Sequence, residues 1–331
     1  MRVLFGEYLS GLVDGPLDPA LLAQGVGMRD AVWADLRVCA AQHPDLQLSC
    51  IGSPQLRPAA DESAFDFVRH EALRHDAVWL IAPETDDILG RLSDAVPPGR
   101  WLGCDGASIR LAASKARTTQ HLHAAGVVTP RAFEADASVQ AWVVKPDDGV
   151  GASDARWHTR RADAQADLAQ RRGAVLEPWV QGPAMSLSLL CEAGRAELLS
   201  VNRQAIAIDG AGWLVEQGVE PLAGVAEPAL QRMAQQVAQA LPGLFGLVGI
   251  DYVLHAERGP VLIEVNPRVT SVFGALARQR PGWLAQAALD LLRRRASSSA
   301  PAVSVAHAAG SGTELVTNVP LSSARRPVGP A

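Results

Sequence analysis

Two kinds of hydrophobic pattern, short apolar runs and longer amphipathic stretches, alternate along the first part of the chain. Short apolar runs predict β-strands at 2–5, 46–52 and 77–83, and amphipathic stretches predict helices at 28–42, 61–75 and 84–96. Strands that alternate with helices in this way are typical of a parallel sheet covered by helices. The pattern therefore predicts a parallel α/β lobe over residues 1–108.

One glycine-rich segment, GVGMRD, lies within this lobe. It contains Gly25 and Gly27, but it follows no predicted strand and lacks the third glycine of a dinucleotide-binding fingerprint. We therefore predict a loop at this position.

After residue 108 the pattern changes. We expect helices at 108–126, 160–172, 227–241 and 282–294, and strands at 141–146 and 173–180. Alternating strands at 184–208 predict a hairpin with its turn near Gly194, and a second strand pair lies within 247–267.

The composition narrows the classes of function. With 48 % hydrophobic and 20 % charged residues among 331, the chain is typical of a soluble globular protein of two or three lobes. A net charge of −5 without a long basic run argues against a nucleic-acid partner. The four scattered cysteines support neither a zinc site nor a disulfide framework. No apolar run is long enough to cross a bilayer and the start lacks a signal peptide, so we expect no membrane partner and a cytoplasmic location.

Basic residues are divided very unevenly between the two types. Lys and Arg total 30, yet only Lys115 and Lys145 are lysines. If a compositional bias replaces Lys with Arg wherever either side chain serves, these two positions need a compact point charge rather than a planar fork. The competing explanation is that the two lysines remain by chance. The motifs around each lysine distinguish the two explanations.

The segment VVKPDDGVGASD places Lys145 at the end of a predicted strand, before a glycine-rich turn. Gly149, Gly151 and Ser153 would let backbone N–H groups approach a phosphate closely, and the lysine would neutralise its charge. The GxxxxGK[ST] pattern of a Walker A loop is absent. Taken alone, the segment is equally typical of an ordinary turn.

Two other segments carry weaker signals on their own. Lys115 lies on a predicted helix, where a lone lysine is normally a surface residue. In VLEPWV, Glu177 and Trp179 end a predicted strand, and they could bind an adenine base or simply terminate the strand.

The clearest chemical signal is the segment LIEVNPRVT with its partner GIDYVL. Asp251 and Glu264 lie thirteen residues apart across a tight turn, so an antiparallel hairpin brings them to neighbouring positions on one face. Two such carboxylates repel unless a cation lies between them, and oxygen ligands suit Mg²⁺, which completes its shell with water and phosphate oxygens. Strict alternation places Asn266 on this face and Ile263 and Val265 toward the core.

In this order the motifs resemble those of the ATP-grasp superfamily. The resemblance rests on the lysines of SKARTTQHLHAAGVVTP and VVKPDDGVGASD and on LEPWV, GIDYVL and EVNPR, and it covers roughly residues 100–295. It implies an ATP-grasp fold of α/β (α+β) class, with the N-terminal parallel α/β lobe, a small ATP-lid subdomain over 109–182 and a C-terminal mixed-sheet subdomain over 183–296. The Ser-, Ala-, Pro- and Gly-rich segment 297–331 is predicted to be a flexible tail.

The resemblance also implies the residues that bind the nucleotide and metal. Lys115 and Lys145 would hold the ATP phosphates, beneath a lid that contains Asp147, Gly149, Gly151 and Ser153. Adenine would be bound by Glu177, Trp179 and Val180. Two Mg²⁺ ions, with Mn²⁺ as an alternative, would be held by Asp251, Glu264 and Asn266.

The catalytic residues implied are Arg268, Lys145 and Arg203. Pro267 ends strand pairing, so Arg268 is expected to leave the strict alternation and turn toward the reacting phosphoryl group. Arg203 would be a second phosphate or substrate contact, and Thr270 and Ser271 would line the acceptor pocket.

The implied activity is ATP-dependent ligation through an acyl phosphate, in which an amine displaces phosphate to form an amide. The opening FGEYLSG resembles that of a subgroup that includes tyramine–glutamate ligases of methanofuran-type cofactor biosynthesis, which makes glutamate and tyramine candidate substrates. Glu7 and Ser10 would then contact the amine, unless Glu7 merely caps the next turn. A bicarbonate-activating, carboxylase-like enzyme and a non-catalytic ATP-binding module are the alternatives. Beyond small molecules, the resemblance suggests only a homodimer partner.

Overall fold

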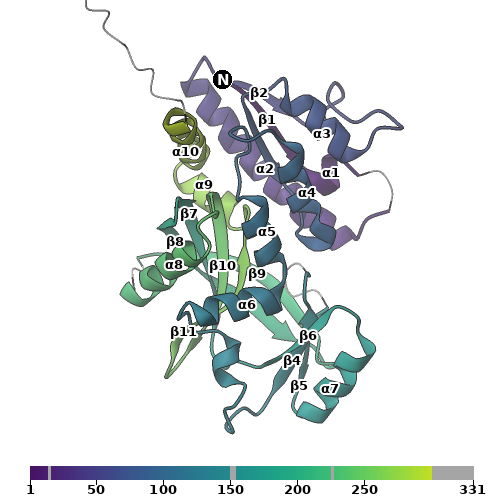
Figure 1. Cartoon of the computed structure of the whole chain (residues 1–331), viewed down its shortest axis with the longest axis vertical. Coiled ribbons are helices and arrows are strands. Elements are labelled where there is room, and N and C mark those ends of the chain that lie inside the picture. Colours follow the sequence, from purple (N-terminus) through teal and green to yellow (C-terminus); the bar gives the residue numbers. More distant parts are fainter. Residues whose placement is uncertain (14–15, 150–153, 225–226, 300–331) are drawn as a thin grey trace, which may run out of the picture. The chain divides into compact units, whose positions relative to one another are not determined.

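The computed structural model describes residues 1–13, 16–149, 154–224 and 227–299 (Figure 1). Its strands are β1 (Arg2–Glu7), β2 (Gln47–Cys50), β3 (Ala77–Ile81), β4 (Trp142–Pro146), β5 (Arg156–His158), β6 (Ala174–Pro178), β7 (Ala184–Glu192), β8 (Arg195–Ile208), β9 (Leu214–Leu222), β10 (Gly246–His255) and β11 (Gly259–Asn266). Its helices are α1 (Tyr8–Gly11), α2 (Pro19–Gln42), α3 (Ala64–Ala72), α4 (Ile88–Ala95), α5 (Gly106–Ala113), α6 (Lys115–Ala124), α7 (Arg161–Gln170), α8 (Pro228–Ala240), α9 (Phe273–Gln279) and α10 (Trp283–Ser299), with 3₁₀ turns η1 (Thr85–Asp87) and η2 (Pro130–Phe133). Within these residues the strands form three sheets, ordered β2-β1-β3, β5-β4-β6 and β11-β10-β7-β8-β9.

The N-terminal sheet is parallel, which confirms the prediction from alternating strands and helices. The central strand β1 pairs Leu4 with Ser49 of β2 and with Val78 of β3. Val3 and Phe5 pack in one core with residues of α2 and α10, while Leu4 packs in another with residues of α3 and α4. The sheet is therefore buried on both faces, which explains why its strands appear as continuous apolar runs.

The glycines of GVGMRD lie inside helix α2, so the predicted loop is wrong. Asp18 caps this helix through two backbone hydrogen bonds, and Pro19 is its first residue. Gly25 packs against Glu7, where an added Cβ atom would lie 2.8 Å from the carboxyl carbon. The glycine therefore permits close packing of the helix on the end of β1.

The two glycines of α2 predict opposite mutational effects. We expect Gly25→Ala to lower the free energy of unfolding by about 1–2 kcal/mol, because the new methyl group would displace a carboxylate that already accepts hydrogen bonds from Leu9 and Ser10. Gly27→Ala should raise it by about 0.5–1 kcal/mol, since its added Cβ meets no atom within 4 Å and alanine is the better helix former. Urea unfolding of both variants measures these differences, and equal effects would contradict the packing role of Gly25.

The segment predicted as one helix over 108–126 is two helices that meet at Ser114. This residue has an extended backbone, with φ −95° and ψ 113°, and its hydroxyl accepts a hydrogen bond from the Arg117 amide. Ser114 thus ends α5 and caps α6. The break gives the chain a helix N-terminus whose first residue is Lys115.

The C-terminal sheet contains both strand pairs that the sequence predicts. β7 and β8 form a hairpin with its turn at Ala193–Gly194, and β10 pairs antiparallel with both β7 and β11. The sequence did not predict β5, β9, α1 or α9. In β9, Gly218 and Pro221 interrupt the alternating pattern that marks a strand.

Residues 1–298 form one compact unit, so the proposed boundaries at 108 and 182 stay predictions. Residues 300–331, which make up most of the predicted tail, lie outside the described residues. No helix within the described ranges has the length and apolar character needed to cross a membrane.

Candidate active site

A cavity of about 430 Å³ is lined by strands of both antiparallel sheets. Its walls include the apolar side chains of Val143, Val180, Ile206, Leu214 and Ile263 and the aromatic ring of Tyr252. Both lysines of the chain, Lys115 and Lys145, line it, and so do Asp251 and Glu264. The structure therefore brings these four predicted site residues together, although they lie far apart in the sequence.

Lys145 lies at the end of β4 with its side chain in this cavity. Only 7 % of the residue is exposed, and its ammonium nitrogen lies 2.6 Å from Oε2 of Glu177 on the neighbouring strand β6. Trp179 and Val180 follow Glu177 and also line the cavity. This arrangement joins the strand-end lysine to the segment LEPWV.

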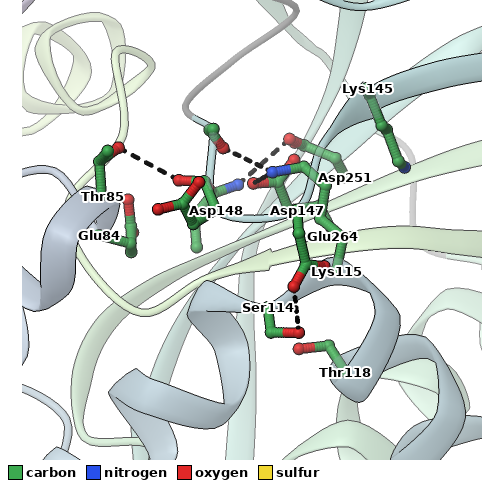
Figure 2. A network of polar contacts seen from close by, with 12 residues as sticks. Glu84, Thr85, Ser114, Lys115, Thr118, Lys145, Asp147, Asp148, Asp251 and Glu264 are labelled. Carbon is green, nitrogen blue, oxygen red and sulfur yellow. Dashed lines mark hydrogen bonds and ion pairs between the residues drawn. The ribbon is translucent and has the colours of Figure 1, made fainter. Parts of the chain in front are cut away.

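Lys115 is placed by the break between α5 and α6. The carboxylate of Asp147 accepts hydrogen bonds from the hydroxyl of Ser114 at 2.7 Å and from the amide of Ala116 at 2.8 Å (Figure 2). The Lys115 side chain is 4 % exposed, and its Nζ lies 3.2 Å from Oε1 of Glu264. Asp147 is thus a second cap of α6, in addition to Ser114. Together the two caps orient Lys115 toward the carboxylate of Glu264.

Two residues at the start of the predicted lid, Asp148 and Gly149, accept hydrogen bonds through their backbone carbonyl groups. Nζ of Lys115 donates to the carbonyl oxygen of Gly149 at 2.5 Å, and the hydroxyl of Thr85 donates to that of Asp148 at 3.1 Å (Figure 2). Gly151 and Ser153, two further predicted phosphate contacts, lie outside the described residues.

The hairpin β10–β11 places the predicted metal ligands together. Asp251 is directly opposite Glu264 in the register, and the amide Nδ2 of Asn266 donates to Oδ2 of Asp251 at 3.1 Å. Val265 is buried in the core as predicted. Ile263 is not, because the register shifts between Asp251 and Tyr252, and the resulting bulge leaves Ile263 on the cavity wall beside Glu264.

Burial and the charge of Glu264 raise the pKa of two acids of the cavity, Asp251 and Glu216. Burial, followed by the charge of Glu264, raises the pKa of Asp251 to about 7 from an ordinary value near 3.8. Glu216 of β9 also lines the cavity, and burial together with Glu264 raises its pKa. The cavity therefore holds more negative charge than its surroundings stabilise.

This charge excess is what a divalent cation relieves, so the residues fit the predicted Mg²⁺ site. Among the described residues, no group of three His, Cys, Asp or Glu side chains forms a metal site by itself. Asp251 and Glu264 supply two carboxylates and Asn266 an amide, which matches the habit of Mg²⁺ to bind one or two carboxylates and complete its shell with phosphates and water.

The raised pKa of Asp251 predicts how pH affects metal binding. Because its folded-state pKa lies above the unfolded value, the protonated carboxyl stabilises the free protein at low pH, and this stabilisation is lost as pH rises through about 7. A bound cation needs the ionised form, so Mg²⁺ affinity should fall by up to about tenfold per pH unit below pH 7. Thermal unfolding with ADP, with and without Mg²⁺, at pH 6, 7 and 8 should show the largest Mg²⁺ effect at pH 8.

Asp251→Asn provides the control for this pH series. The phosphates of ADP titrate in both proteins, so only the difference between them reports the carboxyl group. An Mg²⁺ effect that has the same pH dependence in Asp251→Asn would contradict the assignment.

Arg268 follows β11 and leaves its alternation, as predicted. Its guanidinium lies against Glu84, with Nε 3.0 Å from Oε1 and Nη2 donating to Oε2 at 3.1 Å. A small cavity of about 50 Å³ is lined by Arg268, Thr270 and Ser271 together with Asn266 and Asp251. The residues predicted for the acceptor pocket therefore adjoin the predicted metal ligands.

Glu7, Ser10 and Arg203 occupy different surroundings. Both carboxylate oxygens of Glu7 accept backbone hydrogen bonds, from Leu9 at 3.0 Å and Ser10 at 2.8 Å, so this residue does cap α1. Glu7 also lines a cavity of about 310 Å³ that Arg268 and Asp148 share. Arg203 lines the larger cavity, next to Gln204.

Sequence reasoning missed three polar residues of the site. Gln204 donates to Oδ1 of Asp251 at 3.1 Å, and its place in the strand VNRQ was the one signal that could have found it. Glu216 lies on β9, which was not predicted. Glu84 lies 184 residues from its partner Arg268, and no local pattern connects them.

Two family models match the sequence. The model of the pre ATP-grasp 3 domain matches residues 28–109, and the model of the ATP-grasp domain matches residues 112–272. No functionally curated protein matched the sequence.

Solved structures with this fold include several ligases. D-alanine–D-alanine ligase from Bacillus anthracis superposes with a TM-score of 0.60 at 14 % identity, over 91 % of this chain and 100 % of that one. L-amino acid ligase from Bacillus licheniformis gives 0.56 at 17 % identity, over 82 % and 68 %. Phosphoribosylamine–glycine ligase from Thermotoga maritima gives 0.61 at 15 %, over 89 % and 76 %. At these identities the likeness establishes the fold.

Proposed function

Because the chain belongs to the ATP-grasp superfamily, we propose that it is an ATP-dependent ligase that joins a carboxylate to an amine. One observation carries the proposal. Both lysines of the chain line a single cavity, and each lies beside an acid of that cavity: Lys115 beside Glu264 and Lys145 beside Glu177. The presence of both in one site favours a functional cause over chance for the lysine count.

In the proposed complex, ATP occupies the larger cavity. Its apolar walls at Trp179 and Val180 suit the faces of adenine, and the buried Glu177 is available to the base edge. Lys115, Lys145 and Arg203 supply the positive charge that the phosphates need. The segment that begins at Asp147 would cover the phosphates from the other side.

Asp251, Glu264 and Asn266 would hold Mg²⁺ in this complex. When bound there, the metal would neutralise phosphate charge and act as a Lewis acid. We propose two Mg²⁺ ions at this site, with Mn²⁺ as the alternative metal. Gln204 orients Asp251 through its hydrogen bond, which leaves less freedom for this carboxylate to turn away.

The proposed reaction has two steps. A carboxylate oxygen of the acceptor attacks the γ-phosphorus of ATP, the bond to the β-phosphate oxygen breaks, and ADP leaves an acyl phosphate behind. The amine then attacks the acyl carbon, loses a proton, and inorganic phosphate leaves. Arg268 stabilises the transferring phosphoryl charge from its place beside the metal ligands.

We propose L-glutamate as the first carboxylate to test and tyramine as the first amine. The support is the resemblance of the opening FGEYLSG, because the carboxylate of Glu7 itself caps α1. The cavity that Arg268 shares with Asp148 is lined in part by Leu9, Leu21 and Met28, and an apolar wall beside a carboxylate suits an amine that carries a ring.

The experiment is a two-dimensional substrate screen. The chain is incubated with MgATP and pairs drawn from L-amino acids and amines, with hydroxylamine as a general acyl-phosphate trap. ADP release is followed by a coupled assay, and condensed products are identified by mass spectrometry. ADP formation that requires both a carboxylate and an amine, with the matching amide in the product, supports the proposal.

The same screen separates the alternatives. ADP formation that depends on bicarbonate alone would indicate the carboxylase-like enzyme. ATP binding in calorimetry without turnover for any pair would indicate the non-catalytic module. A homodimer is tested separately, by light scattering in solution.

A further inference from the structure

Among the described residues, Glu84 is the one side chain that forms an ion pair with the guanidinium of Arg268. Arg268 and Glu84 are both nearly buried, with 8 % and 9 % of their side chains exposed. The two carboxylate oxygens of Glu84 lie 3.0 Å from Nε and 3.1 Å from Nη2 of the same planar group. A third nitrogen, Nη1, donates to the carbonyl oxygen of Val269 at 3.2 Å. The hydrogen bonds of Nη1 and Nη2, together with the ion pair at Nε, hold the guanidinium in one orientation.

Glu84 comes from the N-terminal lobe, in the loop that follows β3. The next residue, Thr85, donates its hydroxyl to the carbonyl oxygen of Asp148 at the start of the predicted lid. Figure 2 shows Glu84 and Thr85 side by side next to Asp148. One short loop therefore contacts both the candidate catalytic arginine and the lid.

The backbone of this loop is held in an unusual conformation. Asp86 and Asp87 have φ values of 55° and 56°, in the left-handed region that non-glycine residues rarely adopt. Arg110 fixes Asp87 through a contact of 3.0 Å between Nε and Oδ2, and Gly90 lies so close that an added Cβ would meet Oδ1 at 2.0 Å. Such strain persists when the surroundings determine the conformation, and it is common at functional sites.

Stability gives little reason to bury this ion pair. Removing two charges from water is costly, and apolar side chains of similar volume often serve a core equally well. A buried pair between lobes, beside the candidate metal ligands, is better explained by what it orients. The partner that it orients is the arginine assigned to the transferring phosphoryl group.

We propose that Glu84 is a positioning residue, which holds the Arg268 guanidinium in one orientation toward the reaction centre and so makes the N-terminal lobe part of the catalytic apparatus. The proposal rests on the proposed function, because Arg268 acts on a phosphoryl group only if the chain is a ligase. Glu84 itself touches no reacting atom.

The kinetic test is a double-variant cycle of Glu84→Gln and Arg268→Lys, assayed with MgATP, L-glutamate and hydroxylamine or with the best pair from the screen. Glu84→Gln should lower kcat about tenfold without raising KM for ATP, since the charge of Arg268 stays but its orientation is lost. The double variant should be no slower than Arg268→Lys alone, within about twofold, because Glu84 acts only through the arginine.

Two variants act as controls. Glu192→Gln removes a glutamate from an exposed pair with Arg294 and should leave kcat unchanged. Glu84→Asp keeps the charge but shortens the side chain, so it should recover only part of the lost rate. Rates that multiply in the double variant, or a Glu84→Gln protein with a lower KM and unchanged kcat, would overturn the proposal.

A second measurement does not depend on turnover. In ¹⁵N NMR spectra, slow rotation about the Cζ–Nε bond separates the two Nη resonances of an immobilised guanidinium. The Arg268 signals, assigned by their loss in Arg268→Lys, should be separate in the intact chain and merge in Glu84→Gln. A merged signal in the intact chain would overturn the positioning role, whereas separate signals in a chain without ligase activity would overturn only the proposed function.

Discussion

Glu264→Gln is expected to lower kcat by about 10³-fold while the chain remains folded. The carboxylate lies directly opposite Asp251 in the hairpin and 3.2 Å from the ammonium group of Lys115. Glutamine keeps the shape of the side chain but removes the charge that the proposed metal and Lys115, the proposed phosphate contact, both require. Initial rates of ADP release at saturating MgATP measure the effect.

Stability should change much less than activity in this variant. Losing the partner of a buried lysine destabilises the fold, but the change also removes the negative charge that raises the pKa of Asp251. These two effects offset each other. Glu197→Gln, at an exposed position of β8 in the same sheet, is the matched control and should stay within twofold of the unmodified rate. A folded Glu264→Gln protein with near-normal kcat would remove Glu264 from the metal site.

The hairpin could be predicted because its chemistry is local. Asp251 and Glu264 are thirteen residues apart, so a turn and a period of two suffice to place them opposite each other. The same reasoning failed at Ile263, because a bulge adds one residue to β11 and no apolar–polar pattern reveals it. Local periodicity therefore predicts the pairing of strands better than the face on which each side chain lies.

The sequence pattern could not predict the residues that long-range packing brings into the site. Glu84 meets Arg268 only because the N-terminal sheet packs near the end of β11, and Glu216 lies on a strand that Gly218 and Pro221 obscure. The break at Ser114 is stabilised by Asp147, a cap supplied by the distant turn that follows β4. In each case the missing information is a tertiary contact that outweighs the local propensity.

Lys145→Arg is expected to lower kcat/KM for ATP by about 10²-fold although it preserves the charge. The ammonium group lies 2.6 Å from Oε2 of Glu177, in a side chain that is 9 % exposed. Arginine is longer, and its planar fork would pair with both oxygens of Glu177 instead of presenting a point charge to phosphate. Misplacing a phosphate contact by about 1 Å is enough for an effect of this size.

The reverse exchange at an exposed position tests whether the result is specific. Arg117→Lys, on the exposed face of α6 two residues after Lys115, should leave kcat/KM unchanged because either cation serves there. The kcat/KM values of the two variants in the ADP-release assay show whether a lysine is required at position 145. They thereby test a functional explanation for the presence of only two lysines among 30 Lys and Arg residues. If Lys145→Arg retains normal activity, composition alone explains the count, and Lys145 loses its assignment to the phosphates.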